Sequence, residues 1–305
     1  MDNSEFEKEN EALQNIIKKY EDIMEYYNLR IEAIPKLYKD NPSMIENSIL
    51  MYAEKLRMME KSIDKPYFAR LDFAIDEAQD FGDFSFYALK SLLRNATFSI
   101  FGDLAQSIYQ YRGINNWQNV ANNTFKEKCD MKYLLKSYRT TTEIMNSANN
   151  ITNYINLNVA KPVIRHGKNV KYINYSNTDE QIDKIKSILE QYKESEYKTV
   201  AVICKDEEEA TFINDKLRSD NIKINNITDS DTQYNGGICT ITSYLAKGLE
   251  FDGVIVANAS EGEYNSNKDI DMKLLYVSMT RPLHELNVLY NRNIVKPLQE
   301  EVEIL

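Results

Sequence analysis

The amino-acid sequence predicts an α/β protein built on parallel β-sheets and preceded by a helical hairpin. From residue 68 onward, short apolar runs of strand length alternate with amphipathic segments of helix length. That alternation is typical of strands joined by crossover helices in a parallel sheet. The first 62 residues follow a different pattern, with apolar side chains at heptad spacing. We therefore expect a helical segment followed by two sheet-containing lobes.

The composition is that of an ordinary soluble protein. Of the 305 residues, 43% are apolar and 28% are charged, which is typical of globular domains. No apolar run approaches the roughly 18 residues of a membrane span, and the acidic N-terminus does not resemble a signal peptide. The three cysteines are scattered, which favours free thiols in a reducing cytoplasm and excludes a disulfide framework or a cysteine-based zinc site. We expect a cytoplasmic protein without membrane contact.

The net charge of −10 argues against a general electrostatic nucleic-acid binder. It leaves room for a local basic groove. The longest acid-free stretch with several bases is 161–171, which includes Lys161, Arg165, Lys168 and Lys171. A solvated strand and turn is the simpler interpretation of this stretch.

Residues 1–66 are predicted to form a helical hairpin. Apolar residues recur every three or four positions between 13 and 34, and again between 45 and 59. That spacing places them on one face of each of two helices. Pro42 follows a turn-like segment and suits the first turn of the second helix. The hairpin is interpreted either as a layer packed on the next domain or as an arm that contacts a partner.

Two sheet-containing domains are expected to follow, at 67–130 and 131–305. In the first, strands are expected at 71–75 and 97–101, with a helix at 85–93 between them. In the second, the expected strands are 199–204, 222–226, 238–241, 253–257 and 285–290, and the expected helices are 179–192, 207–218 and 271–280. Functional groups of parallel sheets gather at the carboxyl ends of the strands.

The nine glycines exclude the two common glycine-rich nucleotide loops. A phosphate-binding P-loop needs G-x-x-x-x-G-K-[ST], and a dinucleotide-binding fold needs G-x-G-x-x-G. Neither arrangement occurs in the 305 residues. The sequence therefore contains no nucleotide phosphate loop of its own.

Asp76 and Glu77 directly follow the strand expected at 71–75. Such a pair suits Walker B-type chemistry, in which the Asp holds Mg²⁺ and the adjacent Glu polarises the attacking water. The same two acids could instead cap the next helix. Taken alone, the pair leaves both interpretations open.

A second cluster at 102–113 follows the next strand, and with it the sequence resembles the superfamily-one helicases of the UvrD/Rep type. The segments that resemble motifs II to VI, in the family's order, are 76–80, 102–113, 134–140, 242–252 and 274–281. Residues 244–252 and 280–286 look most like the HelD branch, whose members act on RNA polymerase. The resemblance implies RecA-like parallel sheets, with a partial first lobe and a complete second lobe, and ATP-dependent DNA helicase activity.

Carried over by position, the resemblance assigns five residues to ATP hydrolysis. Asp76 would hold Mg²⁺, Glu77 would activate water, and Gln106 would sense the γ-phosphate of ATP. Arg139 and Arg281 would be arginine fingers, which neutralise the charge that develops on the transferring phosphoryl group. An inter-domain salt bridge is the alternative interpretation of the two arginines.

The resemblance assigns three more residues to the nucleotide. Tyr138 would stack on the adenine ring, and Gly248 and Glu250 would lie beside the nucleotide as well. All three belong to the segments that resemble motifs IV and V. ATP and Mg²⁺ are therefore the expected cofactors.

Single-stranded DNA is the partner that the resemblance implies. Tyr111 occupies a position where the family often has an aromatic side chain that stacks on a base. Arg112 and Tyr244 are further candidates for this contact, although the family usually has His where this sequence has Tyr244. As an alternative, Tyr109 and Tyr111 could be core or interface aromatics, and Trp117 is expected in the core.

Two functions from different classes remain open. In the first, the sequence is the C-terminal motor segment of an ATP-dependent helicase, inactive alone because a missing N-terminal portion would supply the P-loop. In the second, it is a non-catalytic binding module that docks on RNA polymerase through the hairpin.

Overall fold

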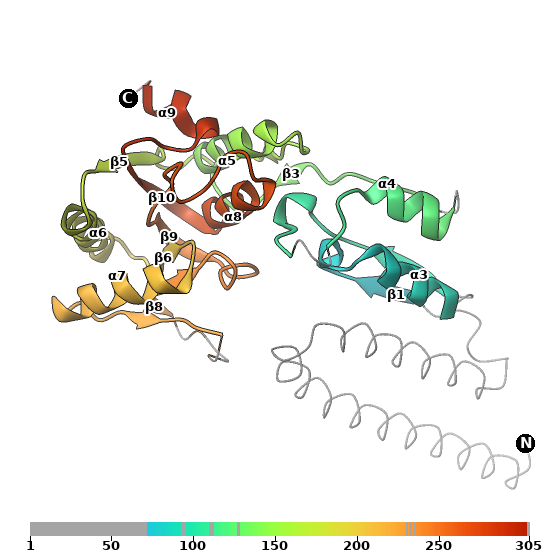
Figure 1. Ribbon diagram of the computed structural model, residues 1–305, viewed down its shortest axis with the longest axis horizontal. Helices are drawn as coiled ribbons and strands as arrows, with labels where there is room; N and C mark the ends of the chain where they lie inside the picture. The colour runs from blue at the N-terminus through green and yellow to red at the C-terminus, as the bar shows by residue number, and fades with distance from the viewer. Residues whose placement is uncertain are drawn as a thin grey trace, which may run out of the picture. The chain divides into compact units, whose positions relative to one another are not determined.

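The computed structural model describes residues 72–92, 96–109, 113–126, 129–229, 231, 234 and 236–303 (Figure 1). The hairpin predicted within 1–66 lies outside the described residues, and so do Tyr111 and Arg112. For the rest of the chain, the prediction of an α/β fold with parallel sheets is confirmed.

The core of the fold is a six-stranded sheet in which all five pairs of neighbouring strands are parallel. Its strands, in spatial order, are β5 (Lys171–Tyr175), β10 (Pro282–Asn291), β9 (Phe251–Val256), β6 (Thr199–Cys204), β8 (Gly237–Thr242) and β7 (Asn225–Asn226). This is the sheet expected of a RecA-like second lobe.

Alternate residues of the central strands point to two different apolar cores. In β6, Val200 and Val202 face one core while Ala201 and Ile203 face the other. The first core is closed by α6 (Thr178–Lys193) and α7 (Glu207–Ser219), and the second by α5 (Thr142–Tyr154) and α8 (Asp269–Met279). Burial on both faces explains why these strands read as continuous apolar runs in the sequence.

Smaller elements lie outside the six-stranded sheet. Two short sheets pair β1 (Asp72–Ile75) with β2 (Thr97–Ile100) and β3 (Lys136–Ser137) with β4 (Lys161–Pro162). The remaining helices are α3 (Asp83–Leu92), α4 (Trp117–Val120) with a π-helical turn at Ala121–Phe125, and α9 (Gln299–Glu303). Three 3₁₀ turns complete the described elements: Ala78–Asp80, Leu104–Gln106 and Lys296–Leu298.

The described chain divides into two compact units. The smaller contains residues 72–73, 83–92, 96–99 and 122–125, and the larger contains 74–82, 100–109, 113–121 and the described residues from 126 onward. The larger unit therefore includes the loops that follow β1 and β2. Ala105 and Ile108 of the second loop belong to the same apolar core as α8, which fixes that loop against the six-stranded sheet. The domain limits at 66 and 130 stay predictions.

Helix α7 begins with an acidic turn that carries one perturbed carboxyl group. Asp206 caps the helix by accepting the amide of Glu209, and Glu209 Oε2 accepts the amide of Lys205 at 3.3 Å. Burial, followed by the nearby charge of Glu263, raises the pKa of Glu209 from 4.5 to about 7. A helix N-terminus favours negative charge, so burial outweighs the helix dipole at this position.

We predict that Glu209→Gln stabilises the protein in alkaline buffer. The raised pKa means that the folded state holds a proton that the unfolded state has lost between pH 4.5 and 7. Stability contributed by this group is therefore lost as the pH rises through that window. At pH 8 the Gln variant should melt about 2–4 °C above the unaltered chain, the shift that about 1 kcal/mol produces in a domain of this size.

At pH 4.5 the Glu209→Gln variant and the unaltered chain should have the same melting temperature. The control is Glu208→Gln, which changes an exposed acid in the same helical turn and should shift the melting temperature equally at both pH values. An equal gain for the two variants at pH 8 would show that the pKa of Glu209 is not raised.

Candidate functional site

The loop after β1 presents Asp76 and Glu77 to solvent. Glu77 has a left-handed backbone with φ of 50°, and its amide donates to Asp76 Oδ1 at 2.9 Å. The Glu77 side chain makes no capping hydrogen bond to the 3₁₀ turn that follows. A left-handed φ is unusual for a residue with a side chain and is found mainly in turns and functional sites. The cap interpretation of Glu77 is therefore wrong.

Gln79 connects the two acidic loops, a role that the sequence did not predict. Its buried amide Nε2 donates to Glu77 Oε2 at 2.5 Å, and its Oε1 accepts the backbone amide of Asp103 at 3.0 Å. Gly102 allows this close approach, because a Cβ there would lie 2.6 Å from Gln79 Oε1. The side chain of Gln79 thus fixes the orientation of Glu77 relative to the loop after β2.

A chain of hydrogen bonds leads from that loop to Arg281. Asp103 Oδ1 accepts the amide of Ala105 at 2.9 Å, and Oδ2 accepts Gln106 Nε2 at 2.8 Å. Gln106 Oε1 in turn accepts Arg281 Nη2 at 3.2 Å. Only one orientation of the Gln106 amide satisfies both partners, because a carboxylate must receive a donor and a guanidinium must meet an acceptor.

Arg281 is enclosed in the protein with neutral partners alone. It is 1% exposed, and its guanidinium donates to the carbonyls of Val277 and Leu249 and to side-chain oxygens of Gln106 and Thr280. Among the described residues no carboxylate pairs with it. Burial, followed by the positive charge of Arg139, lowers the pKa of Arg281 to about 10. The group is still charged at neutral pH. The charges of Glu77 and Glu250 favour the charged form, but no described carboxylate pairs with the guanidinium directly.

Arg139 does have a carboxylate partner. Its Nε lies 2.7 Å from Glu250 Oε1, and both side chains are about two-fifths exposed. Both residues lie in the larger unit, so the ion pair joins motif IV to motif V. Arg139 therefore matches the salt-bridge alternative in part, because it forms an ion pair but within one unit. Arg281 does not match that alternative among the described residues.

A cavity of about 270 Å³ brings several of the predicted residues together. Its lining includes Gln106, Arg139 and Arg281, with Asp103 and Tyr276 beside them. Tyr138, Asp76 and Glu77 are not part of this lining. Tyr138 is 70% exposed. The structure therefore gathers the two arginines and the glutamine around one hollow and leaves the adenine-stacking candidate on the surface.

The turn between β8 and β9 depends on Gly248. Ala246 donates its amide to the Thr242 carbonyl and Leu249 donates to that of Ala246, so the chain turns tightly before Glu250. Gly248 has φ of +83°, a left-handed conformation that glycine adopts without strain. The glycine therefore directs the chain toward Glu250 and does not itself approach the cavity.

Lys247, in the same turn, is a second residue that the sequence reasoning missed. Its side chain is 8% exposed, and its ammonium lies 2.6 Å from Asp80 Oδ2 and 3.6 Å from Glu77 Oε2. The same ammonium lies 5.4 Å from the ring centroid of Tyr109. Both Lys247 and Asp80 stand inside recognisable motifs, but no local spacing indicates a pair separated by 167 positions.

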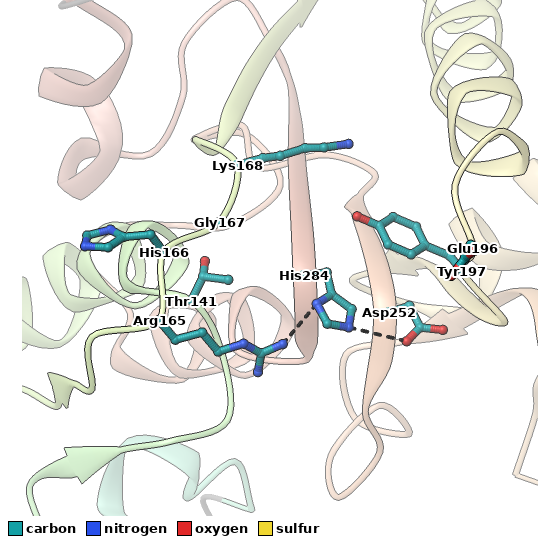
Figure 2. Close-up of a pocket in the computed structure, with 9 residues that line it drawn as sticks. All are labelled: Thr141, Arg165, His166, Gly167, Lys168, Glu196, Tyr197, Asp252 and His284. Carbon is teal, nitrogen blue, oxygen red and sulfur yellow. Dashed lines mark hydrogen bonds and ion pairs between the residues drawn. The ribbon is translucent and has the colours of Figure 1, made fainter.

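The acid-free stretch at 161–171 contributes to a second hollow, of about 430 Å³. Figure 2 shows Arg165, Tyr197 and His284 converging there, with His166 pointing away. Arg165 Nη2 donates to His284 Nδ1 at 2.9 Å, and the His284 ring stacks on Tyr197. Arg165 Nη1 also donates to the carbonyl of Arg139 at 3.0 Å, which fixes the backbone of that predicted finger.

This second hollow is not a simple basic groove. Lys168 Nζ pairs with the buried Glu285 at 2.6 Å, and Asp252 also lines the hollow. Glu285 lies 3.6 Å from Lys171 as well. Two of the four bases of the stretch, Lys168 and Lys171, therefore share one carboxylate within the protein.

Two features are absent from the described residues. None of the helices there combines the length and the apolar character that crossing a membrane requires. No group of three or more His, Cys, Asp or Glu side chains there is arranged to hold a metal ion. Mg²⁺ commonly needs only one or two protein carboxylates besides phosphate oxygens and water, so Asp76 alone is compatible with the predicted role.

We predict that Gly248→Ala destabilises the protein by about 1–2 kcal/mol, the usual penalty for a side chain in the left-handed region. Urea unfolding monitored by circular dichroism measures the change. The matched control is Gly262→Ala, because a Cβ at Gly262 would meet nothing within 4 Å and its φ is not in the left-handed range. Equal midpoints for the two variants would contradict the assigned turn.

Parts of the chain are similar to known helicase proteins. Residues 237–289, from β8 through most of β10, match the family model of the UvrD-like helicase C-terminal domain. The ATP-dependent DNA helicase Rep of Buchnera aphidicola subsp. Acyrthosiphon pisum (strain APS) is 28% identical over 183 residues, which are 56% of this chain and 28% of Rep. The chain thus spans about a quarter of the length of this curated relative.

A solved structure is also similar. It is the crystal structure of the C-terminal domain of a "possible DNA helicase" from Lactobacillus plantarum WCFS1, with 26% sequence identity and a TM-score of 0.45. The match covers 53% of this chain and 92% of that chain. The HelD-like branch stays a prediction. The segment that holds Gly248, Glu250 and Arg281 is similar to the UvrD-like helicase C-terminal domain, as the motifs in the sequence predict.

Proposed function

We propose that this chain is the C-terminal motor segment of an ATP-dependent DNA helicase of the UvrD/Rep type, with Mg²⁺ and ATP as cofactors. The observation that carries the proposal is the buried, carboxylate-free guanidinium of Arg281 beside a cavity that Gln106 and Arg139 also line. Burying a charge without a partner is strongly unfavourable. A bound phosphoryl group would supply the missing negative charge.

The nucleotide side of the site consists of the two arginines and Gln106. Arg281 is preorganised by four neutral acceptors and needs no movement to present its charge. Arg139 is two-fifths exposed and would exchange the carboxylate of Glu250 for a phosphoryl oxygen. Gln106 contacts Arg281 directly. Loss of the γ-phosphate would therefore alter the position of Gln106 and of the loop after β2.

The water side of the site is Glu77. Its Oε2 is occupied by Gln79 and faces Lys247, whereas its Oε1 has no hydrogen bond among the described residues. Glu77 would therefore accept the proton of the attacking water at Oε1. Asp76, exposed at the end of β1, would hold Mg²⁺ through a carboxylate oxygen. Mg-ATP, when bound, would supply the phosphoanhydride bond that is broken.

Tyr138 and Tyr244 are the aromatic contacts of the proposal. Tyr138 is 70% exposed and would stack on adenine, next to Arg139 in the chain. Tyr244 is 40% exposed, and its ring lies 6.2 Å from that of Tyr109, so a base of single-stranded DNA would meet two aromatic rings. Tyr111 and Arg112 stay predictions for the same contact.

The origin of the phosphate loop and the partner of residues 1–66 belong to the proposal as well. The 305 residues contain no P-loop, so we infer that an N-terminal portion of the helicase supplies it. The HelD-like branch and RNA polymerase as a partner rest on the resemblance of the motifs. No contact among the described residues bears on either.

We predict that Tyr138→Ala weakens binding of a fluorescent, non-hydrolysable ATP analogue by about 5-fold or more, because base–aromatic stacking contributes roughly 1–3 kcal/mol. Arg139→Ala should weaken it as well, since it removes one of the three cationic residues that line the cavity. The matched control is Tyr154→Ala on α5, which removes a tyrosine that is also exposed. Equal affinities for all four proteins would contradict the assignment of the nucleotide site.

We also predict that the 305-residue chain by itself does not turn over ATP, with or without single-stranded DNA. Without a P-loop, the chain lacks the backbone amides and the lysine that cradle the phosphates for catalysis. A steady-state phosphate-release assay measures this. Turnover that disappears in Glu77→Gln would refute the prediction, because it would show that the chain is complete for catalysis.

A further inference from the structure

Lys247 lies where three of the helicase-like segments meet. Its ammonium is 2.6 Å from Asp80 and 3.6 Å from Glu77, both in the loop after β1. It also lies 5.4 Å from the ring centroid of Tyr109, in the loop after β2. Because Lys247 itself belongs to the turn after β8, one charged group touches all three loops.

The burial of this ammonium makes its contacts interdependent. With 8% of the side chain exposed, water cannot replace a contact that is lost, so a change at one neighbour shifts the ammonium toward the others. The second oxygen of Asp80, Oδ1, is buried without a hydrogen bond. Asp80 therefore relies on Lys247 to offset its charge. The cation–π contact with Tyr109 and the ion pair with Glu77 thus share one cation, the Lys247 ammonium.

Two further contacts extend this group in opposite directions. On one side, the Tyr109 ring lies 6.2 Å from the ring of Tyr244. On the other side, Glu77 Oε2 is held by Gln79. An unbroken series of contacts therefore runs from the exposed Tyr244 ring, through the partly buried Tyr109 ring and Lys247, to the carboxylate that would activate water.

We propose that Lys247 is a positioning residue that transmits the stacking of a nucleobase on the Tyr109–Tyr244 pair to the carboxylate of Glu77. The inference rests on the function proposed above. A base that displaces either ring alters the cation–π contact of Lys247, and the ammonium then shifts between the ring and the two carboxylates. Glu77 Oε2 gains or loses its ion pair, while Gln79 stays attached to it.

A purely structural role of Lys247 would give a different response to the ligand. If Lys247 only held the three loops together, replacing it would weaken the fold and loosen the loops without affecting how they respond to a ligand. A positioning role requires that the response itself depend on Lys247. It also requires that a conservative substitution preserve part of that response.

Trp117 provides a spectroscopic reporter at the far end of this series. It is the one tryptophan of the 305 residues. A Cβ at Gly102 would lie 2.7 Å from Trp117 Cζ2 and 2.6 Å from Gln79 Oε1, so the indole and the Gln79 amide pack over the same glycine. A displacement of Gln79 that follows Glu77 therefore changes the surroundings of the indole.

The test compares four proteins, each as the full 305-residue chain, in titrations with a fluorescein-labelled thymidine oligonucleotide. They are the unaltered chain, Lys247→Met, Lys247→Arg and the control Lys216→Met. The control removes another lysine that lies over an aromatic ring, 5.7 Å from the centroid of Phe212. Anisotropy of the label reports binding, and Trp117 emission, measured with unlabelled oligonucleotide, reports the response.

We expect the oligonucleotide to change Trp117 emission in the unaltered chain and in Lys216→Met. In Lys247→Met the oligonucleotide should still bind, with at most about a 5-fold loss of affinity, the effect of one weak cation–π contact. The emission change should disappear. Lys247→Arg keeps the charge and should retain part of the change.

A full emission change in Lys247→Met would overturn the inference while leaving the proposed function intact. If Lys247→Met does not fold, Tyr244→Ala decides, since it alters an exposed ring and leaves the Lys247–Asp80 pair in place. That variant should also lose the emission change, and a full change there would overturn the inference. No anisotropy rise for the unaltered chain would contradict the proposed DNA contact and the inference together.

Discussion

The arrangement of the site depends on a buried positive charge that no carboxylate among the described residues pairs with directly. Arg281 sits at the junction of α8 and β10, and neutral oxygens from four residues hold its guanidinium. Enclosing such a charge is unfavourable unless an anion completes the site. Gln106 then acquires a fixed orientation, because it must accept from Arg281 and donate to Asp103.

The sheet explains why these groups can be held with precision. β6, β9 and β10 are buried on both faces by the helices, so the turns at their ends start from fixed positions. Gly248 and Lys247 lie in the turn that enters β9, and Arg281 directly precedes β10. Sites on the ends of rigid elements hold their geometry better than sites on free loops. The hydrogen bonds of Gln79 and Gln106 extend this rigidity to the two acidic loops.

The sequence predicted those parts of the fold that are encoded by local patterns. β6, β8, β9 and β10 were expected because strands buried on both faces read as apolar runs, and α6 and α7 were expected from their amphipathic spacing. Helix α5 was missed because its buried face includes Asn149, whose side chain bonds to the backbone of Ala160. β7 is shorter than predicted, since two residues of the expected strand pair with β8.

For the site, motif order singled out Glu77, Gln106, Arg139 and Arg281 as candidates, but it could not reveal their contacts. The roles of Gln79 and Lys247 arise from pairs that are far apart in the chain, so no periodicity signals them. Likewise, the sequence places Arg165 in a basic stretch. In the fold, its guanidinium donates to the carbonyl of Arg139 and to the ring of His284. Which groups neutralise a charge is a property of the folded chain.

The most direct test of this account is an experimental structure of the chain determined with Mg²⁺ and a non-hydrolysable ATP analogue. The account predicts phosphate oxygens in the cavity beside Arg281, within hydrogen-bond distance of its guanidinium. It also predicts that Arg139 is released from Glu250 and turned toward the same phosphate. An empty cavity at saturating analogue, or an analogue bound elsewhere with the Arg139–Glu250 pair intact, would contradict it.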